Sequence, residues 1–96
     1  SQDPTCQLNA GPDNSKTITY SEAVAIPSWD EVRKLYLSLL PQGVSRTGSF
    51  DPSIWDIIND FNQRGAATYT TTYTITEGDC TDSVELSIIV VPDNLK

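Results

Sequence analysis

The feature that most constrains the fold of this chain is a pair of β-rich runs in its last third. Residues 68–76 contain only Thr, Tyr and Ile, with Tyr or Ile at every second position except 71, and residues 83–91 are rich in Val, Ile and Leu. β-branched and aromatic residues suit a pleated, half-buried surface, and Glu77-Gly78-Asp79 between the runs supplies turn residues. The two runs therefore predict a β-hairpin.

The alternation within residues 68–76 also predicts the two faces of the first strand. Successive side chains on a strand point to opposite faces. One face should therefore hold Tyr69, Thr71, Tyr73 and Ile75, and the other should hold Thr68, Thr70, Thr72 and Thr74. We expect the threonine face to be exposed to solvent, where it could serve as a contact surface.

Length and charge narrow the class of protein. At 96 residues the chain is long enough for a single domain, and its net charge of -7 would repel a nucleic-acid backbone. No apolar stretch approaches the roughly 20 residues that span a bilayer. Residues 1–4 look like the remnant of an expression-vector linker, so we assign the domain to residues 5–96. Nucleic-acid binding and membrane insertion are not expected.

The two cysteines, Cys6 and Cys80, indicate an oxidising compartment. There is no histidine, and the cysteines are too far apart for a CxxC motif, so neither a zinc site nor a redox motif is favoured. A disulfide closing a loop of about 75 residues would contribute on the order of 4 kcal/mol in the chain-entropy model. We interpret the pair as a disulfide of an extracellular protein; the alternative is two free thiols in a reducing compartment.

The middle of the chain predicts one or two short strands followed by two amphipathic helices. Residues 16–20 and 22–26 alternate polar and apolar side chains, as strands do. Ser28 and Glu31 form a capping-box pattern that starts a helix, which ends at Pro41 and Gly43. One stripe of that helix holds Trp29, Val32, Leu35, Tyr36, Leu39 and Leu40.

The second helix is expected to begin after a loop over residues 42–49. Asp51 is the predicted N-cap and Pro52 the first helical residue. Apolar residues then recur at helical spacing, and the helix should end near Gly65. These apolar residues are Ile54, Ile57, Ile58 and Phe61.

This order of elements favours a mainly β fold, an immunoglobulin-like antiparallel β-sandwich. The two short helices would be inserted between the N-terminal strands and the C-terminal hairpin. In that topology the first strand starts beside the final hairpin turn, so Cys6 and Cys80 would meet. The alternative is an open α+β layer, in which both helices cover one face of a single sheet.

Three segments carry a resemblance to a known family. They are Cys-Gln-Leu-Asn-Ala-Gly-Pro-Asp at residues 6–13, Phe50-Asp51-Pro52, and the Thr-Tyr strand at residues 67–76 leading to Cys80. Together they resemble the immunoglobulin-like or PKD-like tandem repeats of Bacteroidetes cell-surface adhesins, including gliding-motility adhesins. The middle of the chain departs from that pattern, because it has a long capped helix and residues 54–64 where the repeats have short elements.

The resemblance implies a role as well as a fold. It implies secretion by a type IX pathway, display on the cell surface, and an adhesive or spacer role in surface attachment or gliding. Neighbouring repeats of the same chain would then be its partners, together with an extracellular polysaccharide or surface.

Catalytic motifs are not found in the sequence. Without histidine there is no Ser-His-Asp or Cys-His arrangement, and the segment from Gly43 to Gly48 misses the GxSxG spacing by one residue. The sequence contains neither a GxGxxG nor a GxxxxGK[ST] motif. We therefore expect a non-catalytic module without a cofactor.

Two groups of residues remain as candidate sites. The acidic hairpin tip, Glu77, Asp79 and Asp82, offers oxygen ligands of the kind that calcium prefers. It lacks the DxDxDG spacing, and acidic turns are common on acidic proteins. Asp13 or Asp51 could join this group only if the fold brought them close.

The two tryptophans form the second candidate site. Trp29 and Trp55 could make a platform on which a sugar ring stacks, although burial in the core is the favoured interpretation. A carbohydrate- or ligand-binding module, with or without calcium, is therefore the alternative to the spacer role.

Overall fold

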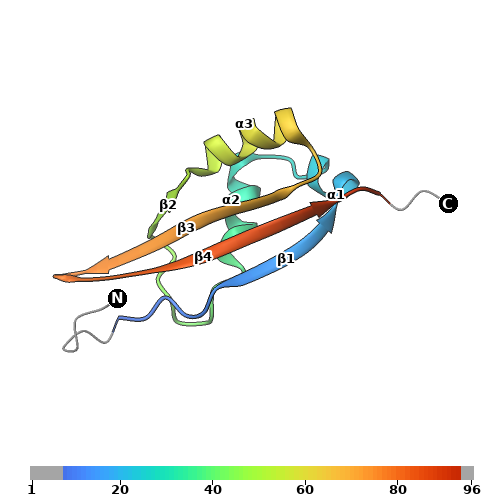
Figure 1. Ribbon diagram of the computed structural model, residues 1–96. Coiled ribbons are helices and arrows are strands. Elements are labelled where there is room, and N and C mark those ends of the chain that lie inside the picture. The colour runs from blue at the N-terminus through green and yellow to red at the C-terminus, as the bar shows by residue number, and fades with distance from the viewer. Residues whose placement is uncertain (1–7, 94–96) are drawn as a thin grey trace.

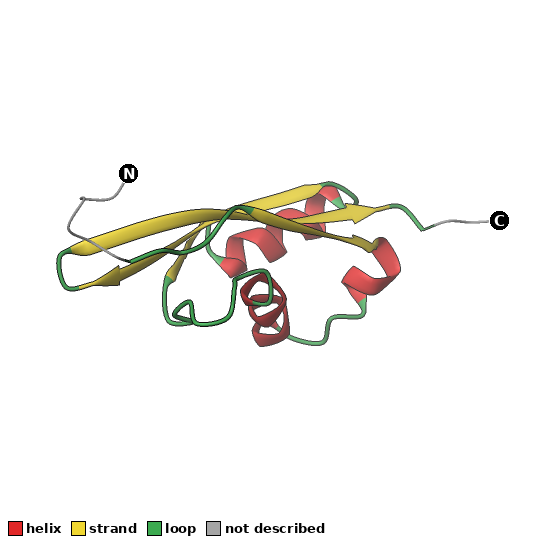
Figure 2. Ribbon diagram, turned by 90° about the horizontal axis from the view of Figure 1, so that it is seen from below, coloured by secondary structure: helices red, strands yellow, loops and turns green. Residues whose placement is uncertain are grey.

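A computed structural model describes residues 8–93 as one four-stranded sheet with three helices on one of its faces (Figures 1 and 2). The strand order is β1-β4-β3-β2. Within the described residues the strands form this single sheet, so the fold is α+β. It matches the open layer, and the second sheet that a sandwich requires is not formed by residues 8–93.

The predicted hairpin is confirmed. Strand β3 (Thr68–Glu77) pairs antiparallel with β4 (Cys80–Val91) across a turn of two residues. Gly78, the first of these, has a φ of +61°, a conformation that a side chain would disfavour and that tight hairpin turns need. The predicted face of β3 is buried and the threonine face is exposed or half-buried.

The first strand makes the sheet mixed. Strand β1 (Asn14–Thr19) runs parallel to β4, and β2 (Ser49–Asp51) runs antiparallel to β3. A parallel neighbour cannot be reached by a tight turn, so the chain between β1 and β4 must cross over the sheet. The segment that crosses contains all three helices, and for this reason they cover one face.

Helix α1 (Tyr20–Val24) replaces the second predicted strand at residues 22–26. Thr19 caps this helix: its hydroxyl accepts a hydrogen bond from the Glu22 N–H, and the Glu22 carboxylate accepts one from the Thr19 N–H. These reciprocal bonds are a capping box. The alternating pattern predicted a strand wrongly because the cap at Thr19 overrides it.

Helix α2 (Trp29–Leu37) starts where the sequence predicts. The Ser28 hydroxyl accepts from the Glu31 N–H, as expected, whereas the Glu31 carboxylate contacts Lys34 at 3.5 Å. The helix ends at Leu37, four residues before Pro41, and Leu37 is buried although it lies off the predicted stripe.

Helix α3 (Ile54–Arg64) starts two residues later than expected. Ser53, and not Asp51, is the N-cap, because its hydroxyl accepts from the Asp56 N–H at 3.2 Å. Asp51 belongs to β2, and the Asp51–Pro52 peptide bond is cis. The helix ends before Gly65, as predicted.

The core lies between the sheet and the helices. Burying each large apolar side chain contributes about 1.5–3 kcal/mol. The sheet supplies Ile18, Tyr69, Tyr73, Ile75, Val84, Leu86, Ile88 and Val90, and the helices and their connections supply Tyr36, Leu37, Leu39, Leu40, Ile54 and Ile57. Helices and sheet therefore bury their apolar faces against one another, and the other face of the sheet stays open.

Candidate functional site

The two tryptophans lie together at the starts of two helices. Trp29 is the first residue of α2 and Trp55 the second of α3, and their ring centroids are 6.0 Å apart with an interplanar angle of 21°. Trp55 is 60% exposed and Trp29 is half-buried. The predicted burial of both rings in the core is therefore wrong for Trp55.

The exposure of Trp55 has a simple geometric cause. The apolar stripe of α3 runs through Ile54, Ile57, Ile58 and Phe61, and Trp55 lies 100° around the helix from Ile54. Its ring therefore stacks on Trp29 of the neighbouring helix and does not enter the core. The spacing of apolar residues identifies the buried stripe of α3. It does not predict that an aromatic residue outside the stripe, such as Trp55, will stack on a residue of another helix.

A shallow apolar groove of about 320 Å³ surrounds the tryptophan pair. Val24, at 55% exposure, and Ile58 and Phe61 of α3 are among its lining residues. The indole Nε1 of Trp29 is buried and has no hydrogen-bond partner within residues 8–93. A buried donor without an acceptor is uncommon in folded proteins. The groove thus presents an exposed aromatic face, while the Trp29 donor lies buried beneath the surface.

The acidic hairpin does not form a metal cage among the described residues. No group of three His, Cys, Asp or Glu residues lies close enough together there to hold a metal ion. Glu77 and Asp79 are exposed, whereas Asp82 accepts a hydrogen bond from the Ala10 N–H at 2.8 Å. Asp13 accepts from the Glu85 N–H instead of joining the tip. The carboxylates of Asp82 and Asp13 therefore join the segment before β1 to strand β4.

Cys80 is the first residue of β4 and is disulfide-bonded. The predicted partner, Cys6, lies outside the described residues, as do residues 1–4. The pairing of Cys6 with Cys80 therefore stays a prediction. Leu8 and Asn9 line the same shallow pocket as Cys80, so the start of the described chain lies at the hairpin end of the molecule.

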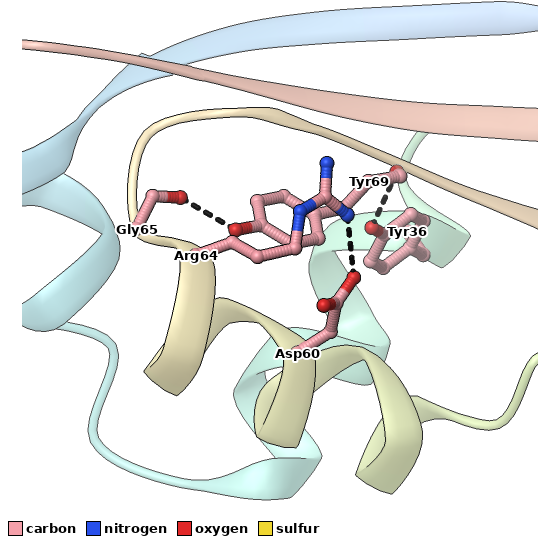
Figure 3. A network of polar contacts seen from close by, with 5 residues as sticks. All are labelled: Tyr36, Asp60, Arg64, Gly65 and Tyr69. Atoms are coloured by element: carbon pink, nitrogen blue, oxygen red, sulfur yellow. Dashed lines mark hydrogen bonds and ion pairs between the residues drawn. The ribbon is translucent and has the colours of Figure 1, made fainter.

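A polar network that the sequence did not reveal joins both longer helices to β3 (Figure 3). The Tyr36 hydroxyl donates to the Tyr69 carbonyl at 2.8 Å, and the Tyr69 hydroxyl donates to the Gly65 carbonyl at 2.5 Å. Arg64 lies over the Tyr69 ring and pairs with Asp60 at 2.7 Å. The Asp60–Arg64 spacing of four was the one visible signal.

Burial controls the ionisation of the two phenols in this network. It raises the pKa of Tyr36 well above its ordinary value, and the negative charge that Tyr69 would carry adds to the effect. The pKa of Tyr69 is also raised, chiefly by burial, with Arg64 opposing the shift. Both phenols stay protonated at neutral pH and act as hydrogen-bond donors in the packing of the helices.

The open face of the sheet carries pairs of hydroxyl groups across β3 and β4. Thr70 and Ser87 lie 2.8 Å apart, Thr74 and Ser83 lie 2.9 Å apart, and Thr76 and Thr81 lie 3.4 Å apart. The hydroxyl groups of each pair therefore form a hydrogen bond with one another. We expect them to bind external groups less strongly than unpaired hydroxyls would.

Comparisons of the chain with protein-family models, curated proteins and solved structures found no match. Among residues 8–93, no helix has the length and apolar character needed to cross a membrane.

Proposed function

We propose that this chain is a non-catalytic spacer module of a larger extracellular, cell-surface adhesin, joined in series to its neighbours. The proposal takes its role from the adhesin-repeat resemblance, which covers the two ends of the chain. It does not need the immunoglobulin-like sandwich, because a single sheet with widely separated chain ends can also act as a spacer.

The observation that supports this proposal most directly is the placement of the first and last described segments of the chain. Ala10 contacts Asp82 beside the hairpin turn, whereas Asp93 contacts Ser21 beyond the far end of β4. These two points lie at opposite ends of a molecule whose extents are 54 × 23 × 19 Å (Figure 1). A chain that enters at one end and leaves at the other adds length to an array.

A tandem of three copies tests the proposal. Small-angle X-ray scattering should show that the maximum dimension grows with each added copy by about the 54 Å long axis of one module. A matched tandem joined by a long Gly/Ser linker provides the flexible reference. A three-copy chain as compact as a globule of the same mass would contradict the spacer role.

The exposed tryptophan pair favours a second function, the binding of an extracellular polysaccharide. The apolar face of a sugar ring can stack on the exposed ring of Trp55. This role is compatible with a spacer, since the groove lies on the side of the long molecule, between α1, α2 and α3.

Tryptophan fluorescence tests this second function. A polysaccharide that stacks on the indole should shift the emission of the native protein, and Trp55→Ala should abolish the shift. Thr81→Ala, a change of an exposed residue next to the hairpin turn and outside the groove lining, provides the control. Unchanged emission over a broad polysaccharide panel would remove carbohydrate binding as a function of the groove.

A further inference from the structure

A small cavity adjoins the tryptophan groove on its inner side, between the sheet and the helices. It has a volume of about 60 Å³, and its lining residues come from β1, β3, β4, all three helices and the segment after α1. The groove has no lining residue from the sheet. Five side chains line both spaces: Ala23, Ile26, Val32, Ile58 and Phe61. The cavity and the groove are therefore separated by these shared side chains alone.

The cavity offers almost no polar group to a ligand. Two of its lining residues, Tyr36 and Tyr69, carry hydroxyls, and both hydroxyls donate to backbone carbonyls of the protein (Figure 3). The other lining side chains are those of Ala, Val, Ile, Leu and Phe. A buried water needs about two to four polar partners. Water therefore gains little in this cavity, and an apolar group can occupy it at little cost.

The size of the cavity selects an aliphatic group. An apolar cavity of about 150 Å³ admits a benzene ring. The cavity of about 60 Å³ is less than half that size, with room for about three or four carbon atoms of a chain. A longer chain would continue into the groove, which has a volume of about 320 Å³ and is lined by Trp29 and Trp55.

The surroundings of both spaces favour an uncharged ligand. Among residues 8–93, neither lining contains Asp, Glu, Lys or Arg, and the polar groove residues include Ser28 and Asn62. The whole chain carries a net charge of -7. An anionic head group would find no basic partner in the lining and would be repelled by the protein as a whole. A hydroxyl head group meets neither obstacle.

Helix α1 is the part of the wall that can move most easily. None of its residues is buried, and its half-buried Ala23 packs against the core together with Ile26, which follows the helix. Segments with few buried apolar contacts open at a low cost in free energy. A displacement of α1 would therefore join the cavity to the groove.

We propose that the cavity and the groove together bind a small, neutral, aliphatic molecule. The end of its chain enters the cavity, and its polar end stays in the groove. This inference goes beyond the spacer and polysaccharide functions and rests on neither of them. A sugar stacked on Trp55 would occupy the groove alone, whereas the aliphatic chain must also reach Ile57 and Ile88, which line the cavity but not the groove.

An NMR titration of the full-length, oxidised protein with 1-hexanol tests the site. The reporters are the methyl groups of Ile57 and Ile88 and the indole of Trp55. All three signals should shift along the same saturation curve. Each CH₂ added between 1-butanol and 1-hexanol should tighten binding about fourfold, as expected for a buried methylene group. A shift of Trp55 without shifts of Ile57 and Ile88 would show adsorption on the surface and would overturn the site.

Two other compounds with six carbon atoms test the selectivity. Cyclohexanol should bind about tenfold more weakly than 1-hexanol because its ring is too large for the cavity. Hexanoate should also bind about tenfold more weakly because its carboxylate is charged. Equal affinity for cyclohexanol would overturn insertion into the cavity, and equal affinity for hexanoate would overturn the assignment of a neutral ligand.

Substitution of Ala23 tests the position of the site. Ala23→Leu places a larger apolar side chain between the cavity and the groove, and it should abolish the shifts of Ile57 and Ile88. Ala25→Leu is the matched control, because Ala25 is exposed and lines neither space. Equal binding of 1-hexanol by the two variants would overturn the site.

A second variant keeps the test decisive whether or not Ala23→Leu folds. Ile88→Val removes one methyl group from the cavity wall, so the cavity can hold about one more carbon atom of the chain. The variant should bind 1-hexanol about fourfold more tightly than the unchanged protein. Unchanged or weaker binding would contradict insertion of the chain beside Ile88.

Discussion

Single polar atoms hold the long loop before β2 against the sheet. The Tyr73 ring is fully buried, and its hydroxyl donates to the Ser45 carbonyl at 2.5 Å while accepting from the Gly48 N–H at 2.9 Å. Gly48 fits here because a Cβ at this position would lie 2.3 Å from the Thr74 carbonyl oxygen. The ring of Tyr73 thus packs in the core, and its hydroxyl forms hydrogen bonds that hold the loop.

Tyr73→Phe should therefore destabilise the protein although it keeps the ring. The change leaves the Gly48 N–H and the Ser45 carbonyl without this partner, at a cost of about 1–3 kcal/mol. Urea unfolding measures the effect. Tyr20→Phe is the control, because Tyr20 is 42% exposed and its hydroxyl makes no hydrogen bond within residues 8–93. Equal stability of Tyr73→Phe and the unchanged protein would refute the anchoring role.

The buried phenol of Tyr36 predicts a loss of stability in alkali. Its pKa in the folded protein lies above the ordinary value of about 10, so its contribution is complete below pH 10. Above that pH the phenol ionises in the unfolded chain but not in the folded one, and stability is lost. The free energy of unfolding, measured from about pH 8 to about pH 11, should fall more steeply for the unchanged protein than for Tyr36→Phe. Parallel curves would contradict the predicted shift.

Among the helices and strands, a helix cap and not the alternating pattern determines the secondary structure of residues 16–26. The sequence around residues 16–26 looks like strand throughout, yet the Thr19–Glu22 capping box ends β1 and starts α1. The Thr-x-x-Glu spacing was visible in the sequence and could have located this helix. By contrast, the hairpin and the stripe of α3 were predictable, because their periodic patterns are long and not interrupted by a cap.

Thr19→Ala should weaken the β1–α1 junction by about 1 kcal/mol, because the Glu22 N–H loses its acceptor. Thr17→Ala provides a matched control on the same strand, since Thr17 is exposed and caps no helix. Both changes remove the same β-branched side chain, so the difference between their unfolding free energies isolates the cap. A difference near zero would show that the capping box contributes little to stability.

At the scale of the whole molecule, the crossover between β1 and β4 determines the shape. Because β1 pairs parallel with the last strand, the chain enters at the hairpin end and leaves at the opposite end. The helices lie within that crossover and cover one face, so the Ser- and Thr-rich face remains open (Figure 2). The separation of the first and last described segments along the molecule therefore follows from the parallel pairing of β1 with β4.

Reduction should lower the stability of the whole domain. Cys80 is disulfide-bonded, and a bond to Cys6 would close a loop of about 75 residues, worth on the order of 4 kcal/mol in the chain-entropy model. Intact mass should rise by two hydrogen atoms on reduction, and the melting temperature should fall. Free thiols in the native protein would contradict both the pairing and the extracellular location.

The hairpin, the buried face of β3, the start of α2 and the apolar stripe of α3 could all be predicted from the sequence alone. These depend on the spacing of apolar residues and on turn residues, which are local properties of the chain. The pairing of β1 with β4, the stacking of Trp55 on Trp29 and the hydrogen bond from Ala10 to Asp82 could not be predicted from the sequence. Such contacts join residues far apart in the sequence, and their energy depends on the register and crossing of whole elements, which no local pattern encodes.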